Sequence, residues 1–204
     1  MTLYALKPRF QSLLRPLVTR LAGAGFTANQ VTLAAAAGSI LLGTGIAVAA
    51  HLRWLFLLLP LWLFIRMAMN GIDGMLAREF GQKSRLGAYL NEIGDLVSDA
   101  ALLLPFATLP LFGPLWTGIV AVLAIIAEFA GAMGPSVGAT RRYDGPFGKS
   151  DRALVFGALA LWIGLGGALP NWLFWLLPLL TLLLLKTIIN RVRAGLAEAS
   201  ECQA

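Results

Sequence analysis

A run of 20 residues without a charged side chain, from Val31 to Ala50, constrains the fold more than any other feature of the sequence. A helix needs about 20 predominantly apolar residues to cross a hydrocarbon core roughly 30 Å thick. Similar runs follow, and 58% of the 204 residues are hydrophobic against 13% charged. One soluble core cannot hide so much apolar surface, so the sequence predicts a polytopic membrane protein.

The spanning segments are expected to be helices. Inside a bilayer every backbone polar group needs a partner within the protein, which leaves helices or a closed barrel. The apolar runs are rich in Leu and Ala and do not alternate with polar residues, which favours helices. We predict one all-α integral membrane domain over residues 1–204 with six transmembrane helices, at about 28–50, 54–80, 86–108, 115–137, 150–169 and 171–189.

The residues before the first span have a different character. Residues 8–22 place apolar side chains at helical spacing with basic residues between them. This pattern is typical of an amphipathic helix that lies in the membrane interface against anionic lipid. Thr27 and Gln30 then have the spacing of a capping box, so the first span should begin there.

The basic residues indicate how the chain is oriented. With six spans both termini lie on one side, and 14 of the 16 Lys and Arg residues fall on that side, against Arg53 on the other and Arg66 within a span. Because cytoplasmic loops tend to carry positive charge, both termini are predicted to be cytoplasmic. The membrane is expected to be a bacterial inner membrane. The net charge of +6 then reflects orientation and lipid contact, and no nucleic-acid partner is expected.

Two polar stripes interrupt the apolar spans. Asn70, Asp73 and Ala77 share one helical face, with Gly74 beside them. The second stripe follows at steps of four residues and comprises Gly87, Asn91, Asp95 and Asp99. The short turn between the two spans should bring the stripes together near the cytoplasmic surface.

The chemistry of the stripes has two interpretations. Carboxylates at membrane depth need a compensating cation or proton, and hard oxygen donors suit Mg²⁺, Mn²⁺ or Ca²⁺. Alternatively, the Asn and Asp side chains form hydrogen bonds across packed helices, and the small residues allow close approach. The combined spacing favours a metal and ligand site.

The stripes together resemble the signature of the CDP-alcohol phosphotransferase family, which is Asp-x2-Asp-Gly-x2-Ala-Arg-x8-Gly-x3-Asp-x3-Asp. This chain has Asn70-x2-Asp73-Gly74-x2-Ala77-Arg78-x8-Gly87-x3-Asn91-x3-Asp95, so every spacing and six of the eight specified identities match. The segment Thr27-Ala-Asn29-Gln-Val-Thr32 is similar to the family's Thr-Pro-Asn-x-x-Thr opening of the first span, and Gly148-Lys149 resembles a Gly-Lys pair that some members carry before the fifth span.

The resemblance implies an activity and a set of residue roles. Members move a phosphatidyl-type group from a CDP-linked lipid donor to an acceptor alcohol in phospholipid biosynthesis and release CMP, with divalent metal. The implied metal residues are Asp73, Asp95, Asn70 and Asn91, with Asp95 also the catalytic base. The implied nucleotide residues are Gly74, Ala77, Arg78, Asn29 and Thr32, and the accessory residues are Asp99 and Gly87.

Two departures from the signature bear on the metal. Asn70 and Asn91 replace the first and third acidic positions, and an amide oxygen can still bind a hard cation but brings no charge. We therefore expect one strongly held Mg²⁺ or Mn²⁺ ion at most, with any second ion dependent on phosphate oxygens of the substrate. Two other carboxylates are candidates to replace the missing acidic ligands in part. Asp99 lies one turn beyond Asp95, and Glu92 has the worse geometry.

Three functions are compatible with these departures: a working transferase, a CDP-lipid hydrolase, and a lipid-binding or partner subunit that has lost catalysis. A transporter is not expected, because residues 55–63 and 100–107 in the outer halves of the two spans carry only apolar side chains. The resemblance also allows a homodimer, and the Gly- and Ala-rich spans permit close helix packing.

A basic loop before the fifth span is the second concentration of polar residues. A phosphate on the acceptor or on a lipid is expected to bind there, with Arg able to bind it through two hydrogen bonds. The alternative is ordinary positive charge on the cytoplasmic side. The candidate residues are Lys149, Arg152, Arg141 and Arg142.

Arg66 lies one turn before Asn70 on the same face of the second span. A charge at this depth needs a partner. We expect Arg66 either to pair with Glu128 of the fourth span or to approach the metal site.

Overall fold

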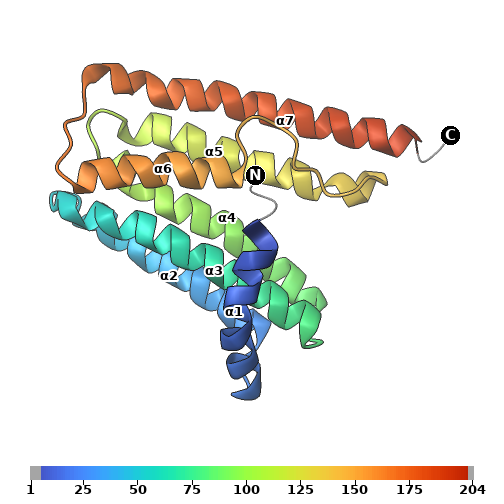
Figure 1. The fold of residues 1–204 in the computed structure, drawn as a ribbon. Helices are drawn as coiled ribbons and strands as arrows, with labels where there is room; N and C mark the ends of the chain where they lie inside the picture. Colours follow the sequence, from blue (N-terminus) through green and yellow to red (C-terminus); the bar gives the residue numbers. More distant parts are fainter. Residues whose placement is uncertain (1–5, 202–204) are drawn as a thin grey trace. The chain divides into compact units, whose positions relative to one another are not determined.

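The computed structural model describes residues 6–201, and all regular structure in this range is helical. The predicted all-α class is therefore confirmed for these residues, while residues 1–5 and 202–204 of the predicted domain lie outside them. The α-helices are α1 (Leu6–Gly23), α2 (Ala28–Val48), α3 (Leu58–Glu79), α4 (Arg85–Ala107), α5 (Gly113–Ala132), α6 (Lys149–Gly164) and α7 (Leu176–Glu201) (Figure 1). Three 3₁₀ segments join them: η2 (Arg53–Leu57), η3 (Gly134–Val137) and η4 (Asn171–Trp175).

Four helical segments within residues 6–201 are long and apolar enough to cross a membrane: Ala28–Val48, Arg53–Glu79, Gly113–Ala132 and Asn171–Glu201. The other two predicted spans correspond to α4, which carries three acidic residues along its length, and to α6, which has 16 residues. Composition and length alone therefore do not mark α4 and α6 as spans. The count of six remains a prediction.

The start of α2 agrees with the predicted capping box. The backbone amide of Thr27 donates to Oε1 of Gln30 at 2.9 Å, and the amide of Gln30 donates to Oγ1 of Thr27 at 3.2 Å. These two bonds satisfy amides that have no partner within the first turn of the helix. The predicted capping box is confirmed, and α2 begins at Ala28.

The ends of the last two long helices differ from the expected span boundaries. The fifth predicted span extends to residue 169, but α6 ends at Gly164 because Gly166 has a φ of 82°, a conformation that stops a helix. The sixth was expected to end at residue 189, but α7 continues to Glu201. The added residues are mostly Ala, Leu, Glu and Arg, which favour a helix without needing a membrane.

The chain forms two compact units. Unit 1 comprises Met1–Leu41 and Leu61–Ser98, and unit 2 comprises Leu42–Pro60 and Asp99–Ala204. Unit 1 thus contains α1, the beginning of α2, most of α3 and the beginning of α4. Unit 2 contains the remaining parts of these helices together with α5, α6 and α7.

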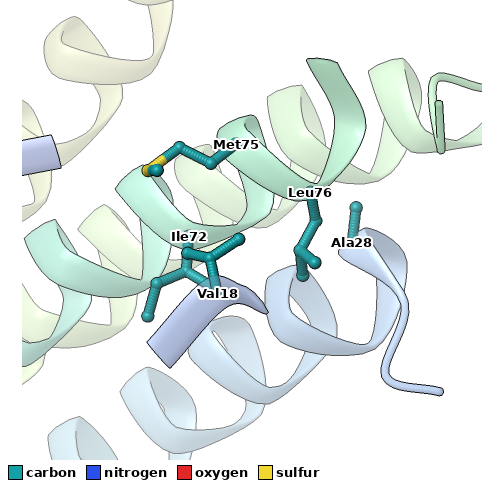
Figure 2. Close-up of a cluster of buried hydrophobic side chains, with 5 residues drawn as sticks. All are labelled: Val18, Ala28, Ile72, Met75 and Leu76. Atoms are coloured by element: carbon teal, nitrogen blue, oxygen red, sulfur yellow. The ribbon is translucent and has the colours of Figure 1, made fainter. Parts of the chain in front are cut away.

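The core of unit 1 joins three helices. Val18 of α1, Ala28 of α2, and Ile72, Met75 and Leu76 of α3 form a buried cluster (Figure 2). At 100° per residue, the three α3 side chains lie on the face opposite to the predicted polar stripe of the same helix. Packing of α1 and α2 against the apolar face of α3 therefore fixes the direction in which the polar face points.

The core of unit 2 is aromatic and aliphatic. The rings of Phe56 and Phe106 have centroids 5.8 Å apart, and those of Phe106 and Phe156 are 5.1 Å apart. Helices α5 and α7 of this unit pack side by side (Figure 1). Gly131 of α5 has no room for a side chain, because a β-carbon there would lie 2.4 Å from the carbonyl oxygen of Arg142.

Candidate functional site

A cavity of about 580 Å³ in unit 1 is lined by both polar stripes. Its walls come from the start of α2, the second half of α3, the turn after α3 and the first half of α4. Every residue that the family resemblance assigns to metal or nucleotide lines it: Asn29, Thr32, Asn70, Asp73, Gly74, Ala77, Arg78, Asn91 and Asp95. Gly87 and Glu92 also line the cavity. The predicted convergence of the two stripes is confirmed for all of their residues except Asp99.

Asp95 of α4 is held from α3 by two donors. The guanidinium of Arg66 donates from Nη2 to Oδ1 of Asp95 at 2.9 Å and to its backbone carbonyl at 3.1 Å. The Nδ2 of Asn70, one helical turn beyond Arg66, donates to the same Oδ1 at 3.3 Å. Arg66 thus approaches the predicted metal residues, which was one of the two expectations for it. Its pairing with Glu128 remains a prediction.

Asp73 is the more buried of the two motif carboxylates. It is 6% exposed, and its Oδ2 accepts a hydrogen bond of 2.8 Å from the hydroxyl of Thr32 on α2. A buried carboxylate needs such a donor to offset its lost hydration. Thr32 therefore fixes the rotamer of Asp73 toward the cavity from a helix 41 residues away in sequence.

Two glycines of the site have polar side chains close to their backbones. A β-carbon on Gly74 would lie 2.9 Å from Nη2 and 3.0 Å from Nη1 of Arg78, so this guanidinium rests against the backbone of α3. A β-carbon on Gly87 would lie 2.7 Å from Oδ1 of Asn29 and 2.9 Å from Oγ of Ser84. A side chain at either position would therefore have to displace the neighbouring polar side chain. The two glycines therefore let polar groups approach the helix backbones beside the cavity.

Two residues that the sequence analysis did not single out organise the turn after α3. Gln82 accepts from the amide of Ala28 at 2.7 Å and donates to the carbonyl of Phe26 at 3.3 Å, which ties the turn to the start of α2. Ser84 accepts from the amide of Gly87 at 2.9 Å and so caps α4. The spacing of Ser84 before α4 is a signal that sequence reasoning could have used. The partners of Gln82 lie 54 and 56 residues away, so local sequence gives no such signal.

The formal charges around the cavity balance without a metal, with three carboxylates and three cations. The carboxylates of Asp73, Glu92 and Asp95 line it together with the cations of Arg78 and Lys83, and Arg66 adds a third cation through its bond to Asp95. Within residues 6–201 no group of three or more His, Cys, Asp or Glu side chains forms a metal cluster. Two carboxylates and two amide oxygens at the motif positions fit one hard divalent ion better than two.

The basic loop lies in unit 2, where Arg142 already has acidic partners. Its Nε and Nη2 donate to the two carboxylate oxygens of Asp144 at 2.9 and 3.0 Å, and Nη1 donates to Glu198. The hydrogen bonds from Arg142 hold the pKa of Asp144 below its ordinary value. The guanidinium of Arg141 lies 5.4 Å from the centre of the Tyr143 ring, and Lys149 begins α6.

Arg152 is buried within an ion network of unit 2. Its Nη2 donates to Oδ2 of Asp99 at 2.9 Å and to Oε1 of Glu128 at 3.0 Å, while Nη1 of Arg191 lies 3.4 Å from the same Glu128 oxygen. Asp99, expected as an accessory metal residue, is not among the residues that line the cavity. The roles expected of Asp99 and of the four basic residues remain predictions.

The sequence of this chain is similar to those of known proteins. A family model described as CDP-alcohol phosphatidyltransferase matches residues 26–187. The inner membrane protein YnbA of Escherichia coli strain K12 is 50% identical over 98% of this chain and 100% of its own length. A phosphatidylinositol phosphate synthase of Mycobacteroides abscessus is 34% identical over 46% of this chain and 40% of its own.

Solved structures share the fold. The phosphatidylinositol phosphate synthase of Mycobacterium tuberculosis with CDP-DAG bound has a TM-score of 0.70 at 20% identity, over 88% of this chain and 92% of its own. The same synthase in complex with manganese and citrate also has a TM-score of 0.70 at 20% identity, over 88% of this chain and 87% of its own. At this level of identity the likeness concerns the fold alone.

Proposed function

This chain belongs to the CDP-alcohol phosphatidyltransferase family, and we propose that it is a membrane transferase that moves a phosphatidyl-type group from a CDP-linked lipid to an acceptor alcohol. One observation carries the proposal: nine residues that the family resemblance assigns to metal and nucleotide, from three helices, line one cavity. The donor class is supported by the solved phosphatidylinositol phosphate synthase with CDP-DAG bound.

The proposed roles are those that the family signature implies, and the shared cavity supports them. Asp73 and Asp95, assisted by the amide oxygens of Asn70 and Asn91, would hold one Mg²⁺ or Mn²⁺ ion. When bound, the ion neutralises the donor pyrophosphate and makes CMP a better leaving group. The manganese complex of the solved relative supports a divalent ion, and the oxygen-only donor set suits either metal.

The nucleotide is proposed to bind where the helix backbones are accessible. Gly74 and Ala77 leave room for it along α3, and Arg78, Asn29 and Thr32 supply polar contacts around it. In the reaction the acceptor hydroxyl forms a bond to the phosphorus of the phosphatidyl group, and the bond from that phosphorus to the CMP oxygen breaks. Asp95 takes the hydroxyl proton. Gly87 keeps the start of α4 close to Asn29.

The acceptor is proposed to bind through the basic residues Lys149, Arg152, Arg141 and Arg142 when it carries a phosphate. Arg142 and Arg152 are already ion-paired with carboxylates of unit 2, so their larger contribution would be structural: Arg142 would order the loop, and Arg152 would join α6 to α4 and α5. Lys149, as the first residue of α6, adds positive charge at a helix N-terminus, where an anion is favoured.

The protein is proposed to cross the membrane six times, with α4 and α6 completing the spans and with both termini cytoplasmic. The positions of the basic residues support this orientation. Helix α1 would lie in the interface: Val18 is buried against α3, whereas Leu13 is 78% exposed and available to lipid. A bacterial inner membrane is supported by the name of the E. coli relative.

Release of CMP by the purified protein tests the function. CDP-diacylglycerol is supplied with Mg²⁺, Mn²⁺ or chelator, across a panel of alcohol acceptors and with none, beside an Asp95→Asn variant. We expect metal-dependent and acceptor-dependent release that the variant loses. Release of CMP without any acceptor would indicate a CDP-lipid hydrolase instead of a transferase. Binding of CDP-lipid without release for every acceptor would indicate a lipid-binding or partner subunit.

A further inference from the structure

Arg66 is a buried cation beside the proposed metal site that neither the motif nor the proposed reaction uses. It lies within α3, is 5% exposed, and pairs with Asp95 of α4. Burial of a guanidinium is costly and is tolerated where a carboxylate compensates the charge. The partner here is the residue proposed as base and metal ligand.

Asn70 acts together with Arg66. The two residues are one turn apart on α3, and both donate to Oδ1 of Asp95, at 3.3 and 2.9 Å. An amide can donate to a carboxylate, whereas an Asp at position 70 would place a second negative charge beside Asp95. Asn70 and Arg66 therefore act together, and groups of the protein itself compensate the negative charge of Asp95.

We propose that Arg66 is a positioning residue that takes the place of a second divalent cation and limits this site to one metal ion. The proposal rests on the proposed function, because it takes the cavity to be the metal site. Arg66 holds Asp95 in place and supplies a permanent positive charge next to it. A site with three carboxylates and three cations around it has little remaining negative charge to attract a second divalent ion.

This role predicts the direction in which the affinity for metal changes when Arg66 is replaced. A merely structural role predicts the opposite direction. A guanidinium beside Asp95 repels a metal ion bound to the same carboxylate, so removal of its charge should tighten binding of the remaining ion. A residue that only supports the fold would, when replaced, loosen the site and weaken metal binding. The direction of the change in Mn²⁺ affinity therefore separates the two roles.

The test measures binding of Mn²⁺ alone to detergent-purified protein, by electron paramagnetic resonance and titration calorimetry, without nucleotide, lipid donor or turnover. We expect one Mn²⁺ per chain in the wild type, and roughly tenfold tighter binding in Arg66→Gln. Arg66→Lys keeps the charge and should bind as the wild type does. Arg15→Gln removes an equal charge from the exposed pair with Glu79 and should leave the affinity unchanged.

Several outcomes would overturn the proposal: two Mn²⁺ ions per wild-type chain, no bound Mn²⁺ in any variant, or weaker binding in Arg66→Gln. If Arg66→Gln does not fold, Asn91→Asp carries the test, because it adds a carboxylate to the cavity while Arg66 stays. We expect it to bind one ion more tightly, and a second ion in that variant would also overturn the proposal. Failure of the transferase assay would leave these binding results unaffected.

Discussion

The guanidinium of Arg78 lies against Gly74, so that a β-carbon on Gly74 would come within 2.9 Å of Nη2 and 3.0 Å of Nη1. Both residues belong to α3 and both line the cavity. The absence of a side chain at position 74 therefore sets where the cation of position 78 rests, beside the proposed nucleotide site.

Gly74→Ala should displace the Arg78 guanidinium and weaken binding of the CDP-linked donor while the protein stays folded, since the far end of an Arg side chain can move. Gly45→Ala is the matched control: it also lies in a helix, and nothing is within 4 Å of its added β-carbon. The control should be neutral or more stable by about 0.5–1 kcal/mol, because Ala favours a helix. Equilibrium binding of CDP-lipid and the melting temperature measure both effects. Unchanged donor binding in Gly74→Ala would contradict the prediction.

Thr32→Val should weaken metal binding at the cavity. The substitution removes the hydroxyl that donates to Asp73 at 2.8 Å but keeps nearly the same volume. A lost hydrogen bond to a charged group costs about 1.5–3 kcal/mol, so we expect affinity for Mn²⁺ to fall by about ten- to a hundredfold. Thr32→Ser keeps the hydroxyl and should retain most of the affinity. Equal losses in the Val and Ser variants would show that the methyl group, and not the hydrogen bond, matters.

Arg152→Met should lower the stability of the protein more than the removal of any surface cation does. Arg152 is 5% exposed, and its loss leaves Asp99 and Glu128 without the cation that they share. Breaking one side of a buried ion pair typically costs about 3–5 kcal/mol. Arg15→Met, which breaks the exposed pair with Glu79, should cost about 0–1 kcal/mol. Thermal unfolding in one detergent compares them, and equal melting temperatures would contradict a structural role for Arg152.

The basic loop should lose stability in acid. Hydrogen bonds from Arg142 lower the pKa of Asp144, so the folded state favours its charged form. The stabilisation is complete above the ordinary Asp pKa of about 3.9 and is lost as the pH falls through the lower folded value. The difference in melting temperature between wild type and Asp144→Asn should therefore be constant from about pH 7 to pH 5 and shrink below about pH 4. A difference that grows toward low pH would contradict this pairing.

Much of the site could be predicted from local pattern. The steps of three and four residues that place Asn70, Asp73 and Ala77 on one face act within two turns of a helix, and the structure places all three in the cavity wall. The capping box of Thr27 and Gln30 spans a single turn and is present as expected. Such features depend on neighbours close in sequence, which is why they can be recognised without knowing how the helices pack.

The partners of the buried charges could not be predicted in the same way. Arg66 could pair with several carboxylates, and packing of α3 against α4 decided that it contacts Asp95, 29 residues away. Gln82 reaches back to residues 26 and 28, and Arg152 shares Asp99 and Glu128. By itself the sequence determined the helical class, the polar faces and the family signature. Only the tertiary structure decided which charge compensates which, because a buried ion pair depends on helices that pack together from distant parts of the chain.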